Sequence, residues 1–139
     1  MKAVILAAGA GTRLGSRTEQ IPKCLLPLGG RALLDHQLDA LAEAGIRDVT
    51  VVAGFQASRV VEHVGTRCQV LLNEDYRSTN SIVSLHRARA AVRGEAFLFQ
   101  NSDVLYSPEL IRRFVTSPRT TAAWSIRCVP SSRASITSN

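Results

Sequence analysis

The chain has 139 residues, of which 45% are hydrophobic, and its formal net charge is +6 at neutral pH. This size and apolar content suit one domain with a buried core and exclude a chain that is disordered throughout. Residues 1–109 carry a net charge of only +1, residues 110–139 carry +5, and no apolar run approaches the ~20 residues of a membrane span. We therefore expect neither a nucleic acid nor a membrane as a partner.

The three cysteines, Cys24, Cys68 and Cys128, are an odd number and lack the spacing of a metal site. The N-terminus leads directly into strand sequence, without the pattern of a signal peptide. We therefore expect reduced thiols in a cytoplasmic protein, with Cys24 more suited to the role of a small buried hydrophobe than to that of an activated thiol.

Strands and helices are predicted to alternate along the chain. Apolar runs predict strands at 3–7, 48–53, 68–72, 96–100 and 121–126, and the first three are rich in Val, Ile and Leu, as is typical of parallel strands covered on both faces. Helical patterns lie between them at 32–44, 57–63, 81–92 and 108–114. The alternation predicts an α/β fold with a Rossmann-like parallel sheet and helices on both faces.

Several residues mark where these helices begin and end. Asn80 and Ser107 are predicted N-caps, and Gly45 and Gly94 are predicted stop signals. In the helix at 81–92 we expect Ile82, Leu85 and Val92 to share one face. We assign residues 1–126 to one domain and expect the polar residues 127–139 to form a disordered tail.

A small-residue loop follows the first predicted strand. It runs from Ala7 to Thr12, and the absence of Cβ atoms at Gly9 and Gly11 lets backbone N–H groups approach a polyphosphate closely. Arg13 and Lys23 follow as cations that would neutralise phosphate charge. The spacing fits neither the dinucleotide fingerprint nor a Walker A loop, and a plain tight turn between strand and helix is the alternative.

The sequences LAAGAGTRLG, PKCLLPL and GGRALLDHQLDALAEAGI together resemble the opening of the nucleotidyltransferase family, which makes activated sugars and alcohols from a nucleoside triphosphate and a phosphorylated substrate. The resemblance implies that the loop binds the base and triphosphate, that Arg13 holds the phosphates and that Lys23 contacts them at the reacting centre. The residues expected to bind nucleotide in this segment are Leu6, Ala7, Ala8, Gly9, Gly11, Thr12 and Arg13.

Asp103 lies at the end of the predicted strand at 96–100, on the edge where parallel sheets bind ligands. Its position alone suits a Mg²⁺ ligand and a turn aspartate about equally. The segment FLFQNSDVLYSPEL resembles the one that holds the metal in the family, which favours Mg²⁺ on Asp103, although many members have Gly where this chain has Ser102.

The segment at 73–85 resembles the phosphocholine cytidylyltransferase branch of the family more than its sugar branch. The resemblance implies that Asn73, Asn80 and Ser81 lie near the base, and Asn80 suits a helix cap equally well. His36, His63 and His86 lack a catalytic or metal context, so we expect structural roles for them.

The arginines Arg87, Arg89 and Arg93 are expected to lie on a solvated helix face. A substrate with a quaternary ammonium group would bind in a cage of aromatic side chains. Tyr76 is one of the few residues that could contribute to such a cage.

The resemblance covers residues 2 to about 116, and no acidic residue follows Glu109. Family members are longer and carry a second metal-binding carboxylate, so we expect this chain to hold an incomplete domain that binds nucleotide but turns over slowly. The resemblance implies transfer of CMP from CTP to a small phosphorylated alcohol such as phosphocholine, with pyrophosphate leaving. The alternatives are a sugar-1-phosphate nucleotidyltransferase and an inactive chain that binds nucleotide or a partner. Oligomeric state is not predicted.

Overall fold

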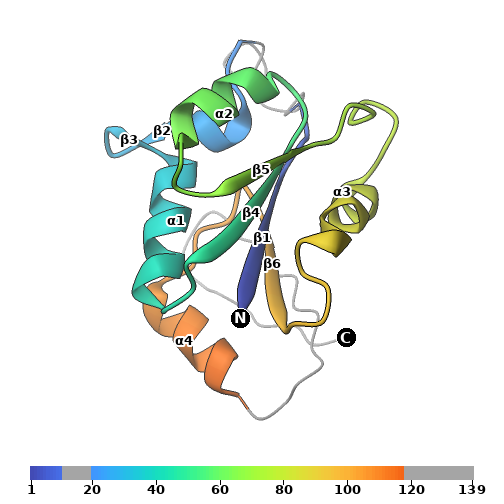
Figure 1. The fold of residues 1–139 in the computed structure, drawn as a ribbon. Helices are drawn as coiled ribbons and strands as arrows, with labels where there is room; N and C mark the ends of the chain where they lie inside the picture. Colours follow the sequence, from blue (N-terminus) through green and yellow to red (C-terminus); the bar gives the residue numbers. More distant parts are fainter. Residues whose placement is uncertain (11–19, 118–139) are drawn as a thin grey trace.

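The computed structural model describes residues 1–10 and 20–117 of the chain. Four parallel strands form one sheet in the order β5-β4-β1-β6, as Figure 1 shows. They are β1 (Lys2–Ala7), β4 (Asp48–Ala53), β5 (Gln69–Leu72) and β6 (Phe97–Asn101). Four of the five strands predicted from apolar runs are thus confirmed to within about a residue at each end, and the strand predicted at 121–126 lies outside the described residues.

The order of the strands creates a switch point between β1 and β6. The chain passes from β1 to β4 and β5 on one side, and then returns to place β6 on the other side of β1. In this register Ile5 lies beside Val51 of β4 and Gln100 of β6. Loops that leave the carboxyl ends of strands at a switch point diverge, and ligands of open α/β sheets bind in the resulting crevice.

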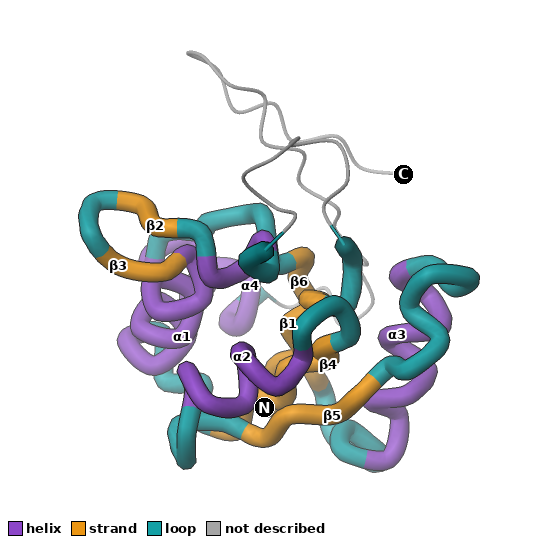
Figure 2. Tube along the Cα trace, turned by 90° about the horizontal axis from the view of Figure 1, so that it is seen from above, coloured by secondary structure: helices purple, strands orange, loops and turns teal. Residues whose placement is uncertain are grey.

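Helices cover both faces of the sheet, which confirms the predicted α/β architecture. Helices α1 (Leu33–Glu43), α2 (Ala57–Val64) and α4 (Pro108–Thr116) lie on one face, and α3 (Ser81–Arg87) lies on the other (Figures 1 and 2). Alternate residues of β1 explain the two cores, because Ala3, Ile5 and Ala7 pack against the first group while Val4 and Leu6 face the α3 side. Within the described part of the chain, no helix has the length and apolar character needed to cross a membrane.

The predicted caps form as expected. The side-chain oxygen of Asn80 accepts hydrogen bonds from the backbone N–H groups of Ile82 and Val83, and Ser107 accepts one from Leu110. Gly45 follows α1 with a φ of +87°, a left-handed conformation that glycine adopts without strain.

The helix predicted at 81–92 is shorter than expected. It ends at Arg87 and tightens into a 3₁₀ turn, η3 (Ala88–Ala90), so the 3.6-residue period does not continue to Val92. Ile82 is 74% exposed, and the prediction that it shares a face with Leu85 and Val92, which pack on the sheet, is therefore wrong. The buried residue of α3 is Ser84.

A small hairpin between β1 and α1 was not predicted. Its strands are β2 (Pro27–Leu28) and β3 (Arg31–Ala32), and the two glycines between them have φ values of +59° and +82°. Positive φ at both central residues is the geometry of a type I′ turn, which the Gly-Gly dipeptide signals. The strands escaped prediction because each has only two residues.

The segment before the hairpin anchors it to the core. A 3₁₀ turn, η2 (Lys23–Leu25), precedes β2, and Cys24 is 1% exposed among the core residues of the α1 face. Burial raises the pKa of the Cys24 thiol to about 12. Cys24 is therefore a buried hydrophobe, as expected, and not an activated thiol.

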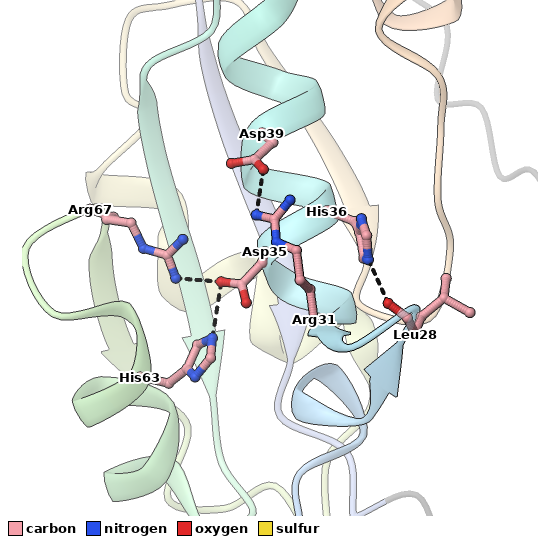
Figure 3. A network of polar contacts seen from close by, with 7 residues as sticks. All are labelled: Leu28, Arg31, Asp35, His36, Asp39, His63 and Arg67. Atoms are coloured by element: carbon pink, nitrogen blue, oxygen red, sulfur yellow. Dashed lines mark hydrogen bonds and ion pairs between the residues drawn. The ribbon is translucent and has the colours of Figure 1, made fainter.

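Polar contacts join the hairpin, α1 and α2, as Figure 3 shows. The carboxylate of Asp35 at the start of α1 accepts hydrogen bonds from His63 at 3.0 Å and from Arg67 at 2.5 Å. Burial alone would raise the pKa of Asp35, but the hydrogen bonds from Arg67 and His63 outweigh it and lower that pKa. His36 donates to the carbonyl of Leu28 at 2.8 Å, so both histidines drawn in Figure 3 have structural contacts.

Candidate functional site

A cleft of about 200 Å³ opens at the carboxyl edge of the sheet, on the side of α3. One wall is the end of β1 with the loop that follows it, and the other is the segment that joins β5 to α3. The lining residues are Leu6, Ala8, Gly9, Tyr76, Thr79, Asn80, Ser81 and Ser84. The structure therefore brings together five residues that the sequence predicts to bind nucleotide, from two segments about seventy residues apart.

Other predicted nucleotide-binding residues do not line this cleft. Ala7 is 5% exposed and packs in the core of the α1 face, because side chains alternate across a strand. Gly11, Thr12 and Arg13 lie outside the described residues, so their expected phosphate contacts stay predictions.

The two walls of the cleft meet over Gly54, the residue after β4. A Cβ atom at this position would lie 2.6 Å from Cβ of Tyr76 and 2.7 Å from the carbonyl oxygen of Ala8, closer than real Cβ atoms come. The same carbonyl accepts a hydrogen bond from the N–H of Phe55, whose ring packs edge-on against Tyr76. The cleft thus depends on the missing side chain of Gly54.

Asn73 holds the second wall in place. It is 1% exposed, its backbone N–H donates to Ala53, and its side-chain Nδ2 donates to Thr79 Oγ1 at 2.9 Å and to Ser84 Oγ at 3.1 Å. These bonds fix two residues that line the cleft. The predicted contact of Asn73 with a base stays a prediction, and among the described residues its side-chain oxygen has no hydrogen-bond partner.

Asp75 and Arg87 form a second tie between this wall and α3. The backbone carbonyl of Asp75 accepts hydrogen bonds from the hydroxyls of Ser78 and Thr79, and its carboxylate pairs with Arg87 at 2.5 Å. The prediction that Arg87 lies on a solvated helix face is therefore wrong, because this side chain reaches back to the loop. Among the described residues, Arg89 bonds only within its own helical segment, to His86.

Lys23 and Asp103 contact each other at the same edge of the sheet, on the side of α1. The ammonium group of Lys23 lies 2.7 Å from the carboxylate of Asp103, and the two side chains are 30% and 42% exposed. Lys23 comes from η2, which packs against α1, and Asp103 follows β6. The predicted phosphate-binding cation and the predicted metal ligand are thus neighbours.

Residues 3–135 match the model of one protein family, described as the MobA-like NTP transferase domain. The chain belongs to this family. The resemblance to nucleotidyltransferases inferred from the sequence is therefore confirmed, together with the parallel α/β fold.

Two similar proteins illustrate the kinds of enzyme to which this chain is related. The chain is 34% identical to the CMP-5′-(3-aminopropyl)phosphonate synthase of Streptomyces rubellomurinus over 88% of this chain and 20% of that protein. It is 34% identical to the choline-phosphate cytidylyltransferase of Streptococcus pneumoniae over 73% of this chain and 47% of that protein.

Among solved structures, a nucleotidyl transferase from Methanothermobacter thermautotroptrophicus superposes with a TM-score of 0.69 at 31% identity, over 81% of this chain and 55% of that one. The chain thus spans from a fifth to about half of the length of these similar proteins.

The donor set at Asp103 fits one ligand of a hard divalent cation. Mg²⁺ keeps several waters and binds through one or two carboxylates plus substrate phosphates, so a single exposed carboxylate such as that of Asp103 suits a first protein ligand. Across residues 1–10 and 20–117, no three His, Cys, Asp or Glu side chains gather into a larger metal site.

Three lining residues were not assigned to the site from the sequence, namely Tyr76, Thr79 and Ser84. Thr79 is next to the predicted site residue Asn80, and Ser84 is one helical turn after Ser81. The sequence thus identifies the right segment but not these two lining residues. Tyr76 was considered only for a cation cage. Tyr76 packs beside Gly54 and Phe55, which follow β4, and no local pattern reports these contacts.

Proposed function

We propose that this chain forms the nucleotide-binding part of a cytidylyltransferase. A phosphate oxygen of a small phosphorylated alcohol, phosphocholine being favoured, attacks the α-phosphorus of CTP, the bond to the β-phosphate oxygen breaks, and pyrophosphate leaves. The observation that carries the proposal is the cleft between the β1 loop and the segment at 73–84, which lies on the same sheet edge as Lys23 and Asp103. The names of the two curated relatives, a CMP-conjugate synthase and a choline-phosphate cytidylyltransferase, favour cytosine.

In this proposal the cleft takes the base and the loop after β1 takes the triphosphate. Neutral hydrogen-bonding groups from Thr79, Asn80 and Ser81 border the cleft, as a base with donors and acceptors requires. Small residues at the end of β1 let backbone N–H groups approach the phosphates, and Arg13 would bind them from the following residues.

Lys23 would stabilise the negative charge at the reacting phosphate. To do so its ammonium group exchanges the carboxylate of Asp103 for phosphate oxygens, and the released carboxylate is then available to hold Mg²⁺. Mg²⁺, when bound, supplies further charge neutralisation on the phosphates. Lys23 and Asp103 thus align and neutralise the triphosphate, and no covalent enzyme intermediate is involved.

A nucleotide panel tests the proposal. The melting temperature of the chain is measured with CTP, UTP, dTTP, ATP and GTP at millimolar concentration, each with Mg²⁺. We expect CTP to raise the midpoint most, because a ligand that binds the native state stabilises it by mass action. A larger shift with UTP or dTTP would favour the sugar-1-phosphate alternative, and no shift with any nucleotide would refute the nucleotide site.

Two arginine variants test where the triphosphate binds. Arg13→Ala removes a charge expected on the phosphate loop, and we expect it to weaken CTP binding by roughly ten- to a hundredfold, the equivalent of a charge-assisted contact of about 1.5–3 kcal/mol. Arg89→Ala is the matched control, because in the part of the chain that the structure describes Arg89 bonds within its own helical segment. Equal losses of affinity from the two variants would contradict the assignment.

A further inference from the structure

Asp103 belongs to a tight turn that follows β6. The N–H of Val104 donates to the carbonyl of Asn101 at 3.3 Å, which closes the turn, and Asp103 is its third residue. The N–H of Ser102 donates to the carbonyl of Leu6 at 3.0 Å. The turn is therefore tied to the end of β1, next to the cleft.

One buried side chain outside the turn holds both of its ends. Gln37 of α1 is 2% exposed, and its Nε2 atom donates to the carbonyl of Asn101 at 2.9 Å and to the carbonyl of Val104 at 2.6 Å. Only N–H groups bond two carbonyls at once, so the orientation of this amide follows from its partners. The two carbonyls come from the residues that open and close the turn around Asp103.

Gln37 is a polar residue at a buried position of α1. Gln37 lies on the inward face of the helix, with Leu34 one turn before it and Leu41 one turn after it, both fully buried. The core positions around it are filled by apolar side chains, and burial of an amide is costly unless it is bonded. The two carbonyl contacts satisfy the N–H groups of the amide and connect α1 to the turn, while among the described residues its Oε1 atom has no hydrogen-bond partner.

We infer that Gln37 is a positioning residue, which clamps the turn at 101–104 and thereby sets where the carboxylate of Asp103 meets Lys23 and an incoming metal–triphosphate complex. That Gln37 holds the turn is inferred from the geometry of the unliganded protein. That this contact affects metal binding rests on the proposed function. In the described structure Gln37 hydrogen-bonds two backbone carbonyls of the turn and is not itself a lining residue of the cleft.

The clamp is tested first without any ligand, by residue-resolved amide hydrogen exchange. Gln37→Glu keeps the shape but loses both donors when ionised, and Gln37→Met is a second, uncharged variant in case the first does not fold. Ile46→Val is the control for a small loss of buried volume in the same core. We expect the amides of Ser102 and Val104 to exchange about tenfold faster in the Gln37 variants, relative to Ile46→Val. Unchanged protection of these two amides would overturn the inference.

The effect on the metal is tested by a double-mutant cycle. The affinity for CTP is measured by calorimetry with Mg²⁺ and with EDTA, in Gln37→Met, Asp103→Asn and the double variant. We expect Gln37→Met to weaken Mg²⁺-dependent binding about tenfold, and we expect this loss to disappear once Asp103 is replaced. A loss that persists in the Asp103→Asn background would show a general structural role and overturn the inference.

The two tests separate this inference from the proposed function. Absence of CTP binding by the unmodified chain, with or without Mg²⁺, would refute the proposed function. The exchange measurement in the unliganded protein would still decide whether Gln37 holds the turn.

Discussion

On the α3 side of the sheet edge, the lining residues of the cleft are held by neutral contacts, and one ion pair, Asp75–Arg87, ties their loop to α3. On the α1 side, Lys23 and Asp103 are held by charge. Asn73 bonds Thr79 and Ser84 inside the cleft wall, and Tyr76 packs over Gly54. By contrast, Lys23 and Asp103 neutralise each other across 2.7 Å while both remain partly exposed.

Under the proposed function, this difference separates a part that is formed before the ligand arrives from a part that rearranges when it binds. Buried neutral hydrogen bonds and close packing respond little to salt, whereas exposed ion pairs weaken as salt screens them. Under the proposed function, the cleft is preformed for a base, and the Lys23–Asp103 pair changes partners when a triphosphate binds.

The largest effect is expected at Gly54, where the two walls of the cleft meet. Gly54→Val places side-chain atoms against Tyr76 and the carbonyl of Ala8, so we expect a loss of about 3 kcal/mol in the free energy of unfolding, together with loss of CTP binding. Denaturant titration measures the first and calorimetry the second. Gly9→Ala is the control for stability, because a Cβ atom at Gly9 meets nothing within 4 Å, and we expect a change within about 0.5 kcal/mol. Equal stability losses at the two glycines would contradict the packing argument.

Lys23→Ala should separate binding from stability. The pair with Asp103 is partly exposed, so we expect its loss to lower the free energy of unfolding by only about 0–1 kcal/mol. Under the proposed function, affinity for CTP should fall by about 1.5–3 kcal/mol. Paired denaturation and calorimetry check both numbers, and a variant that loses stability but keeps its CTP affinity would place Lys23 outside the site.

Asn73→Ala, on the α3 side, should mainly lower stability, whereas Lys23→Ala should mainly lower the affinity for CTP. The Asn73 substitution leaves the hydroxyl of Ser84 without its buried donor and removes one of the two hydrogen bonds of the Thr79 hydroxyl, so we expect a loss of about 1–3 kcal/mol in the free energy of unfolding. Because no charge is involved, the loss should be the same in low salt and in 1 M NaCl. A stability loss that shrinks strongly in high salt would show that the loop is held by charge after all.

The sequence predicts the sheet and much of the cleft, because local patterns encode them. Runs such as Val4-Ile5-Leu6 mark buried strands, and Asn80 marks both a helix start and a cleft position. Small residues at the end of β1 mark a loop that must approach a ligand.

Features that depend on distant contacts were not predicted. Gln37 meets carbonyls 64 and 67 residues away, and Tyr76 packs beside Gly54 after β4, so neither contact leaves a local pattern. Arg87 was assigned to solvent because a periodic helix face does not reveal the loop to which it returns. The shared face predicted for Ile82, Leu85 and Val92 is not formed, because Ile82 is exposed while the other two pack on the sheet.

The smallest effect is expected at Asp35, and it tests whether charge also organises the rest of the α1 side. The pKa of Asp35 lies below its ordinary value of 3.8, since burial, which raises the pKa, is outweighed by the hydrogen bonds from Arg67 and His63. A carboxyl group with a lowered pKa in the folded state stabilises the protein above its unfolded pKa, and this contribution is lost as the pH falls through the folded value. Asp35→Asn should therefore cost about 1 kcal/mol at pH 7, and the difference from the unmodified chain should shrink below about pH 4.

Asp39→Asn is the matched control for this last prediction, because Asp39 lies one turn further along α1 and pairs with Arg31 at the surface, where both side chains are about half exposed. Charge pairs this exposed contribute little, so urea titrations of the Asp39 variant and the unmodified chain should agree at every pH. The Asp35 side chain is only 13% exposed, which is why the two aspartates should differ. If the difference in the free energy of unfolding between Asp35→Asn and the unmodified chain stays constant from pH 7 to pH 3, the contact between α1 and α2 depends on packing. Ion pairing would then matter on the α1 side at Lys23 and Asp103, and not at Asp35.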